Sequence, residues 1–389
     1  MQVRLSKQDL LKKITEEHEF DDFVVTERDG NGSSIMSSLS YVTFRAKGKT
    51  DMKLFAKTAA WIEKLRLNSP IIPCPFTIEL YFYKTLWKQY EKLEDMWNVP
   101  MEHRFRKPTL YGSSVEYLNE TLVIQDLIAQ GYEEYERQTP ADFEYMSAGI
   151  ALIAQFHALS LAYSQYDPEG FKQANEYLTL DESKLVIWIG SMSSKLLANA
   201  FSSAEKHRDK LEKYFKTPKS LLQLIMDCYR RGNDKVLIHG DFKPSNLMQR
   251  RRNGKLELCV VDFQNVHDAD AVADIMYFIF TATDESFRRV HYHELLDLYY
   301  EKLKASLLRL RVDPEQVYPE NKYRSRLEKC AMLGLAIGVA CLPVVLVDKE
   351  NAPAFDKDSD ATAVAVEGSA LFQERFNGIL NNYVEWGLL

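Results

Sequence analysis

Residues 236–246 of this 389-residue chain read VLIHGDFKPSN, a short apolar strand pattern that runs directly into a loop of polar residues. An Asn-Gly pair at residues 253–254 then predicts a β-hairpin, because this dipeptide adopts the backbone angles that tight hairpin turns need. The return strand ends in VDFQ at residues 261–264. The hairpin should therefore bring the loop that carries Asp241 and Asn246 close to Asp262.

Two carboxylates and one amide in this arrangement suit phosphoryl transfer. One carboxylate can orient an attacking hydroxyl and accept its proton, while an amide oxygen and a second carboxylate can hold Mg²⁺ against phosphate oxygens. We assign the base role to Asp241 and the metal-binding role to Asn246 and Asp262. His239 would tie this loop to the strand that ends at Asp262. The alternative, a polar turn in which Asp and Asn serve only turn geometry, leaves the pairing with Asp262 unexplained.

The N-terminal part of the chain offers two further charged residues that this reaction needs. Contact with the α/β-phosphates calls for a lysine on a strand and a helix glutamate that pairs with it. Lys57 ends a strand predicted at residues 52–57, and Glu79 lies early in a helix predicted from Phe76 to Met96. An earlier hairpin tip stands where a phosphate-covering loop belongs, with backbone amides and small hydroxyls available. The residues of this tip assigned to nucleotide binding are Gly30, Gly32, Ser33 and Ser34.

The order of the predicted elements divides the chain into two unequal parts. Strand patterns are concentrated before Leu127, and helical patterns prevail beyond it except near the polar loop. We therefore predict an α+β, bilobal protein with a small β-rich N-terminal lobe at residues 1–127. A large, mainly helical C-terminal lobe would follow at residues 128–389.

Composition limits the partners and the environment of the protein. The formal net charge of −7 argues against nucleic acid as the main partner, because a surface that binds many phosphates normally carries a basic excess. The five cysteines are widely spaced and odd in number, which favours a reducing compartment over a disulfide framework. The N-terminus lacks the unbroken apolar run of a signal peptide. We expect a cytoplasmic protein.

The apolar run from Cys330 to Val347 approaches the length of a membrane-spanning helix. Gly334, Gly338 and Pro343 interrupt this run, and neither an aromatic belt nor a basic cluster flanks it. We predict a buried helix of the C-terminal lobe with a turn at Pro343, and no membrane span.

Several motifs of this chain resemble those of the ecdysteroid kinase-like family, a branch of the choline kinase and aminoglycoside phosphotransferase group with a protein-kinase-like fold. They occur in the family's order from about Asp29 to beyond Phe280. The combination of FHALS with DFQ, in place of DFG, is the distinctive part. The motifs are FTIELYFY at 76–83, VIQDL at 123–127, AQFHALS at 154–160, HGD at 239–241 with Asn246, VDFQ at 261–264 and DIMYF at 274–278.

The resemblance implies a kinase that uses ATP and Mg²⁺ to phosphorylate a small-molecule hydroxyl. Steroid moulting hormones are the family's named substrates, and detoxification substrates are inferred for other members. By the same resemblance, Gln125 and Leu127 would contact adenine through their backbone, and Asp274 would brace the catalytic loop. Gln125 departs from the family pattern, which usually has an acidic residue there.

Lys243 is the second departure, because the family commonly has an aromatic residue at that position. The surrounding sequence looks like the loop of protein Ser/Thr kinases, whose lysine touches the transferred phosphate. Lys243 is therefore a candidate catalytic residue beside Asp241, and the alternative is a solvated loop lysine.

Two other functions, a protein kinase and a catalytically inactive binding protein, fit the sequence less well than a small-molecule kinase. A protein kinase would need a long activation segment ending in Ala-Pro-Glu, but only eleven residues separate Asp262 from Asp274 and that tripeptide is absent. A catalytically inactive binding protein of the same fold is disfavoured by the intact set of charged residues. Apolar residues such as Trp188, Met192 and Phe201 suggest a hydrophobic acceptor, an ecdysteroid-like or xenobiotic alcohol, although they could equally form core.

Overall fold

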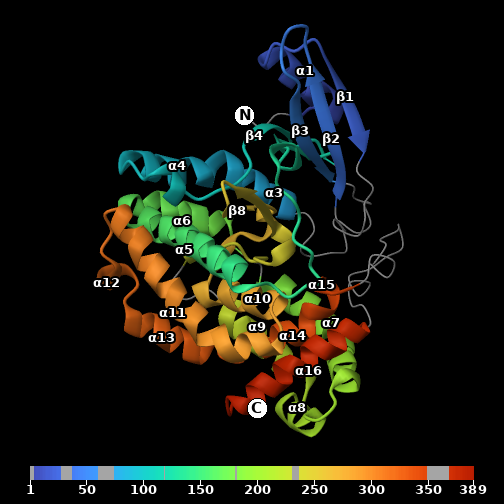
Figure 1. The fold of residues 1–389 in the computed structure, drawn as a ribbon, viewed down its shortest axis with the longest axis vertical. Coiled ribbons are helices and arrows are strands. Elements are labelled where there is room, and N and C mark those ends of the chain that lie inside the picture. Colours follow the sequence, from blue (N-terminus) through green and yellow to red (C-terminus); the bar gives the residue numbers. More distant parts are fainter. Residues whose placement is uncertain are drawn as a thin grey trace.

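The structure, a computed structural model, describes residues 4–27, 37–59, 74–117, 119–179, 182–229, 236–347 and 368–389. Within these residues, a small lobe built on one antiparallel sheet is followed by a large, mainly helical lobe (Figure 1). The α+β architecture with two unequal lobes, predicted from the sequence, is therefore confirmed.

The sheet of the N-terminal lobe has five strands in the order β1-β2-β3-β5-β4, and all neighbours are antiparallel. The strands are β1 (Asp22–Glu27), β2 (Ser37–Arg45), β3 (Met52–Ala59), β4 (Leu110–Ser114) and β5 (Thr121–Gln125). Helix α1 (Lys7–Glu17) packs Leu10, Leu11 and Ile14 against buried sheet residues such as Leu54. Because side chains alternate along a strand, Lys57 lies on the opposite face of β3 from Leu54.

One continuous helical segment lies between the sheet and the helical lobe (Figure 1). It consists of α3 (Cys74–Tyr81), a π-helical turn (Phe82–Leu86) and α4 (Trp87–Met96). The helix predicted from Phe76 to Met96 is confirmed, but the π-helical turn was not foreseen. Such turns are rare and occur frequently at functional sites. Here the turn buries Phe82 and Tyr83, whose rings both contact the ring of Phe263.

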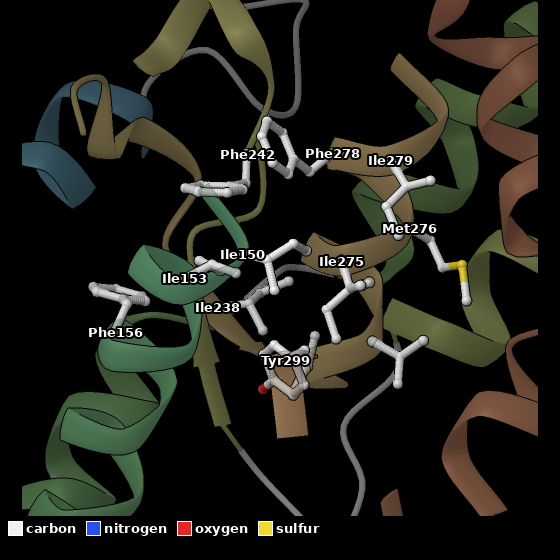
Figure 2. Close-up of a cluster of buried hydrophobic side chains, with 14 of the residues drawn as sticks. Ile150, Ile153, Phe156, Ile238, Phe242, Ile275, Met276, Phe278, Ile279 and Tyr299 are labelled. Atoms are coloured by element: carbon white, nitrogen blue, oxygen red, sulfur yellow. The ribbon is translucent and has the colours of Figure 1, made fainter. Parts of the chain in front are cut away.

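The C-terminal lobe is built around helix α5 (Phe143–Tyr166), which packs along α11 (Glu285–Arg309) and against α10 (Ala271–Ala282). Figure 2 shows apolar side chains from α5, α10 and strand β6 (Val236–Ile238) meeting in this core. The remaining elements are α6 (Pro168–Tyr177), α7 (Glu182–Ser203), α8 (Arg208–Tyr214), α9 (Pro218–Tyr229), β7 (Leu247–Arg252), β8 (Lys255–Val260), β9 (His267–Ala269), α12 (Pro314–Val317), α13 (Glu320–Lys329), α14 (Leu333–Ala340), α15 (Leu342–Val345) and α16 (Ala370–Glu385).

The apolar segment at Cys330–Val347 forms two short helices, α14 and α15, that are mostly buried in this lobe. The helix is interrupted at Cys341, between α14 and α15. Pro343 lies in the first turn of α15, where a proline costs no helical hydrogen bond. The buried location is as predicted, while the break comes two residues earlier. Among the described helices, α5 is long and apolar enough to cross a membrane, and 78% of its most apolar window is buried inside the protein.

Candidate active site

Two strand pairings bring the two polar loops together. The β7–β8 hairpin pairs Leu247 with Val260, with Asn253 and Gly254 at positive φ in its turn. Strand β6 pairs with β9, which follows the second loop. The two loops, residues 239–246 and 261–266, are thus each held between paired strands at both ends. The β7–β8 hairpin predicted from the sequence is present.

His239 links the two loops through its side chain. Its Nε2 donates to the backbone oxygen of Val261 at 3.1 Å, and its Nδ1 accepts from the backbone N–H of Asp241 at 3.3 Å. Burial lowers the pKa of His239, which favours the neutral ring that this pair of bonds needs. The structural tie predicted for His239 is therefore present.

The candidate base, Asp241, is held by two neighbours in its own loop. The Nζ of Lys243 donates to both carboxylate oxygens of Asp241, at 2.8 and 2.7 Å. The side-chain amide of Asn246 donates to the backbone oxygen and to one carboxylate oxygen of Asp241, both at 2.9 Å. Burial alone would lower the pKa of Lys243. The Asp241 carboxylate outweighs this effect, so the pKa of Lys243 lies above its ordinary value. With 24% of its side chain exposed and an ion pair made, Lys243 is not a solvated loop lysine.

Asp274 braces the backbone of the same loop. Its carboxylate accepts from the backbone N–H of His239 at 2.7 Å and from that of Gly240 at 2.9 Å. His157 on α5 contacts the same carboxylate at 3.2 Å, and its other ring nitrogen meets the Tyr299 hydroxyl at 2.8 Å. The brace that the family resemblance implied for Asp274 is therefore present. No sequence pattern indicates a polar role for Tyr299, because its partner His157 lies far away along the chain.

Lys57 bridges two acidic residues from different parts of the chain. Its Nζ lies 3.0 Å from Oε2 of Glu79 and 2.6 Å from Oδ1 of Asp262. Burial alone would lower the pKa of Lys57, but the Asp262 and Glu79 carboxylates raise it well above its ordinary value. Burial likewise opposes ionisation of Asp262, yet Lys57 holds the pKa of this carboxyl below its usual range. The pairing of Lys57 with Glu79 that the sequence hypothesis requires is thus present. Burial raises the pKa of the Glu79 carboxyl, and the nearby Lys57 ammonium opposes this shift.

The two residues that follow Asp262 in the DFQ motif, Phe263 and Gln264, both help to hold Asp262 in position. Asp262 has a left-handed backbone with φ 68°, and the ring of Phe263 stacks on Phe82 of the π-helical turn at 3.7 Å. The amide of Gln264, oriented to satisfy its neighbours, donates to Asp262 Oδ1 at 3.3 Å and accepts from Lys57 Nζ at 3.1 Å. Gln264 therefore supports the ion pair directly, a role that the sequence analysis missed.

A cavity opens beside Lys57, between the sheet and the β7–β8 hairpin. It measures about 120 Å³, and Lys57, Glu79, Gln125, Leu127 and Asp262 line it together with apolar residues from both lobes. The apolar lining residues include Phe55, Pro108, Ile124, Ile128, Met248 and Val261. Sites that enclose a whole drug-sized ligand usually span about 300–1,000 Å³. This cavity therefore fits one part of a nucleotide, and its apolar walls suit a planar base.

Gln125 keeps a structural contact despite its departure from the family pattern. Its side-chain oxygen accepts from the backbone N–H of Thr109 at 3.2 Å, and its own N–H donates to the Thr109 carbonyl at 2.9 Å. These two bonds hold the end of strand β5 beside the cavity.

The donor set fits Mg²⁺ held jointly by protein and phosphates. Among the described residues, no group of three or more His, Cys, Asp or Glu could hold a metal ion. Mg²⁺ usually takes one or two carboxylates together with substrate phosphates, so a site of this kind is compatible with Asp262 and Asn246. Asp262 has 33% of its side chain exposed, and the Asn246 amide nitrogen faces Asp241, which turns its oxygen the other way.

The other predicted site residues belong to the glycine-rich hairpin tip and to the apolar set suggested for the acceptor. Gly30, Gly32, Ser33 and Ser34 lie outside the described residues, as does the side chain of Trp188. Met192 is a buried core residue, and Phe201 is partly buried against the same core. These two residues therefore pack the helical lobe, which is the alternative that the sequence left open.

The fold and site together define a kinase-type phosphotransferase: a strand lysine paired with a helix glutamate and an aspartate, beside a braced catalytic loop. Residues 31–312 match the model of the Ecdysteroid kinase-like family, and the chain belongs to this family.

Solved structures with a similar course of the chain include three small-molecule kinases at low sequence identity. Spectinomycin phosphotransferase in complex with ADP and spectinomycin has a TM-score of 0.45 and 10% identity, covering 95% of this chain and 99% of that one. The GDP complex of wild-type aminoglycoside 2'-phosphotransferase-IIIa scores 0.43 with 13% identity, covering 95% and 98%. A microcompartment-associated aminopropanol kinase scores 0.41 with 10% identity, covering 97% and 99%.

One curated protein is similar over a shorter stretch. Over 118 residues the chain is 28% identical to a Caenorhabditis elegans protein described as "Uncharacterized oxidoreductase dhs-27". The match covers 28% of this chain and only 14% of that protein.

Proposed function

We propose that the protein transfers the γ-phosphoryl group of ATP to a hydroxyl of a small hydrophobic alcohol, either ecdysteroid-like or xenobiotic. The observation that carries the proposal is the Lys57 ammonium held between Glu79 and Asp262 at the mouth of an apolar cavity. Membership in the ecdysteroid kinase-like family supports the same reaction class.

The nucleotide would lie between the two lobes. The apolar cavity beside Gln125 and Leu127 would take the base, and Lys57 would neutralise charge on the phosphates. Asn246 and Asp262 would hold Mg²⁺. Bound Mg·ATP would supply the phosphoryl group and leave as ADP.

Asp241 would act on the acceptor. Its carboxylate would orient the acceptor hydroxyl and take up its proton as the new oxygen–phosphorus bond forms. Lys243 now pairs with both oxygens of Asp241, so one oxygen must be released before a hydroxyl can bind there. A shift of Lys243 toward the transferred phosphoryl group would release that oxygen and add a positive charge where negative charge develops.

An aromatic wall near Asp241 supports a hydrophobic acceptor. Tyr229 and Tyr277 are only partly exposed, and burial followed by nearby charges including Asp241 raises the pKa of both phenols. Burial and Asp241 likewise raise the pKa of the Cys341 thiol to about 12. Two rings and a neutral thiol near the base would favour an apolar molecule with one reactive hydroxyl over a highly charged one.

The first test is nucleotide binding, read as thermal stabilisation by ATP with and without Mg²⁺. We expect Lys57→Met to abolish the Mg²⁺-dependent shift. Lys53→Met should retain it, because Lys53 is on the same strand but exposed and outside the cavity. Wild-type protein that Mg·ATP does not stabilise would contradict the proposal at its first step.

The second test is transfer itself. Steroid and xenobiotic alcohols would be incubated with Mg·ATP, and products read by the mass gain of one phosphate. Asp241→Asn should abolish transfer while keeping Mg·ATP stabilisation, since the change removes the base and leaves Lys57 in place. Transfer by Asp241→Asn at the wild-type rate would refute the role of Asp241. Transfer to polar aminoalcohols but not to apolar alcohols would refute the substrate class.

A further inference from the structure

A second and larger cleft lies on the N-terminal lobe, away from the nucleotide cavity. It measures about 590 Å³ and shares no lining residue with the cavity beside Lys57. Its walls are helix α1, the π-helical turn with the start of α4, and strand β4 with the residues just before it. This volume lies within the range of about 300–1,000 Å³ that is usual for small-molecule sites.

The cleft is basic in an otherwise acidic chain. Four lysines and two glutamates line it: Lys13, Lys84, Lys88, Lys107, Glu17 and Glu91. Lys13 pairs with Glu17 at 3.4 Å. Among the described residues, no carboxylate lies within ion-pair distance of Lys84, Lys88 or Lys107. The cleft thus gathers an excess of positive charge, although the whole chain carries a net charge of −7.

The pKa values of two lysines in the cleft, Lys84 and Lys107, are lowered. Burial, followed by the positive charges of Lys13 and Lys88, lowers the pKa of Lys84. Burial lowers the pKa of Lys107 to about 8, although Glu91 and other groups oppose the shift. A bound anion would relieve both the repulsion and the poor solvation, because it stabilises the charged amines.

Aromatic rings form one wall of the cleft. The Nζ of Lys107 lies over the rings of Trp87 at 4.5 Å and Tyr83 at 5.3 Å. Tyr83 is almost fully buried, and its hydroxyl has no hydrogen-bond partner among the described residues. The cleft therefore offers an apolar surface beside its ammonium groups, as a site for an organic anion would.

Tyr83 also connects this cleft to the catalytic residues. Its ring meets that of Phe263 edge-on at 5.7 Å, and Phe263 follows Asp262 directly. Tyr83 lies one helical turn after Glu79, within the π-helical turn that also carries Lys84. A molecule that contacts Tyr83 and Lys84 would thus bear on the helix that positions Glu79.

We propose that this cleft is a second ligand site, which binds a small organic molecule carrying a phosphate group or another multiply charged anion. Lysine ammonium groups bind phosphate as point charges, and the buried ring of Trp87 holds the ammonium of Lys107 at the wall of the cleft. Occupation steadies the helical segment from Glu79 to Lys88. The site is separate from the nucleotide and acceptor sites and does not depend on the proposed reaction.

The test is titration calorimetry of the full chain with sodium tripolyphosphate, without Mg²⁺, in a Lys57→Met background that weakens the nucleotide site. Lys84→Gln/Lys88→Gln should weaken binding about five- to tenfold, because the anion loses two ion pairs that are each partly screened by solvent. The control is Lys12→Gln/Lys92→Gln, with the same charge change on α1 and α4 at exposed positions outside the cleft. The control should change binding by less than about twofold.

Several outcomes would overturn the proposal. Absence of tripolyphosphate binding would mean that the cleft is not an anion site. Equal weakening in both double variants would mean that tripolyphosphate responds only to net charge. If Lys84→Gln/Lys88→Gln does not fold, Lys107→Gln replaces it and must weaken binding without altering the unfolding midpoint. Because the titration uses no turnover, a chain inactive as a kinase leaves this result interpretable.

Discussion

Gly240→Ala tests whether the catalytic loop depends on close packing at this glycine. Gly240 has φ +78°, a conformation that costs an L-residue about 1–2 kcal/mol. An added Cβ would also lie under 3.0 Å from the backbone oxygen of Asn265, a backbone atom that cannot rotate away as a side chain can. Overpacking of this kind costs roughly a further 1–3 kcal/mol. The free energy of unfolding should therefore fall by about 2–5 kcal/mol.

Gly254→Ala is the matched control, measured by urea unfolding alongside Gly240→Ala. Gly254 has nearly the same φ, +76°, but no described atom lies within 4 Å of its added Cβ. It should lose only the conformational part, about 1–2 kcal/mol. Equal losses in the two variants would refute the claim that contact with Asn265 makes Gly240 necessary.

The same pair of variants separates stability from catalysis. Gly240 precedes Asp241, and its N–H donates to Asp274, so an added methyl group should displace the candidate base. We expect kcat to fall roughly tenfold to a hundredfold, because small misplacements of reacting groups are costly. The KM for ATP should change little, and Gly254→Ala should retain both constants. Wild-type kcat in folded Gly240→Ala would contradict the positioning of Asp241 by this glycine.

Three further predictions follow from buried polar groups. Burial raises the pKa of Glu94 to about 7, against the opposing hydrogen bond from the Phe105 N–H. The folded protein therefore holds this proton more tightly than the unfolded chain, and stability falls as pH rises from about 4.5 to about 7. Glu94→Gln should remove this fall and be up to about 3 kcal/mol more stable than wild type at pH 8, measured by urea unfolding. Asp274→Asn should lose at least about 2 kcal/mol, since charge-assisted bonds to the loop backbone weaken, and kcat should drop with it. Tyr299→Phe should lose about 1–3 kcal/mol in the same assay, because a buried nitrogen of His157 loses its partner.

Each of these predictions has a result that would contradict it. For Glu94→Gln, it is a decline of stability between pH 5 and pH 8 as steep as in wild type. For Asp274→Asn, it is a wild-type urea midpoint. For Tyr299→Phe, it is a loss no larger than that of an exposed tyrosine such as Tyr214→Phe.

Short-range sequence patterns account for the local geometry of the candidate site. Asp241, Asn246 and Asp262 lie on one strand-loop-hairpin unit, whose turn chemistry and apolar alternation act between neighbours in the chain. The same short-range patterns predicted the strand that carries Lys57 and the helix that carries Glu79. Such features are readable because backbone preference and periodicity are properties of adjacent residues.

The contacts between residues far apart in the chain depend on the three-dimensional fold. The contact of Tyr299 with His157, the support of Gln264 for Lys57 and the core position of Met192 each join elements far apart in sequence. The basic cleft at Lys107 likewise exists only where α1, α4 and β4 come together. Burial and the crowding of like charges depend on packing in three dimensions, so no pattern along the chain indicated that the lysines of this cleft lie close together.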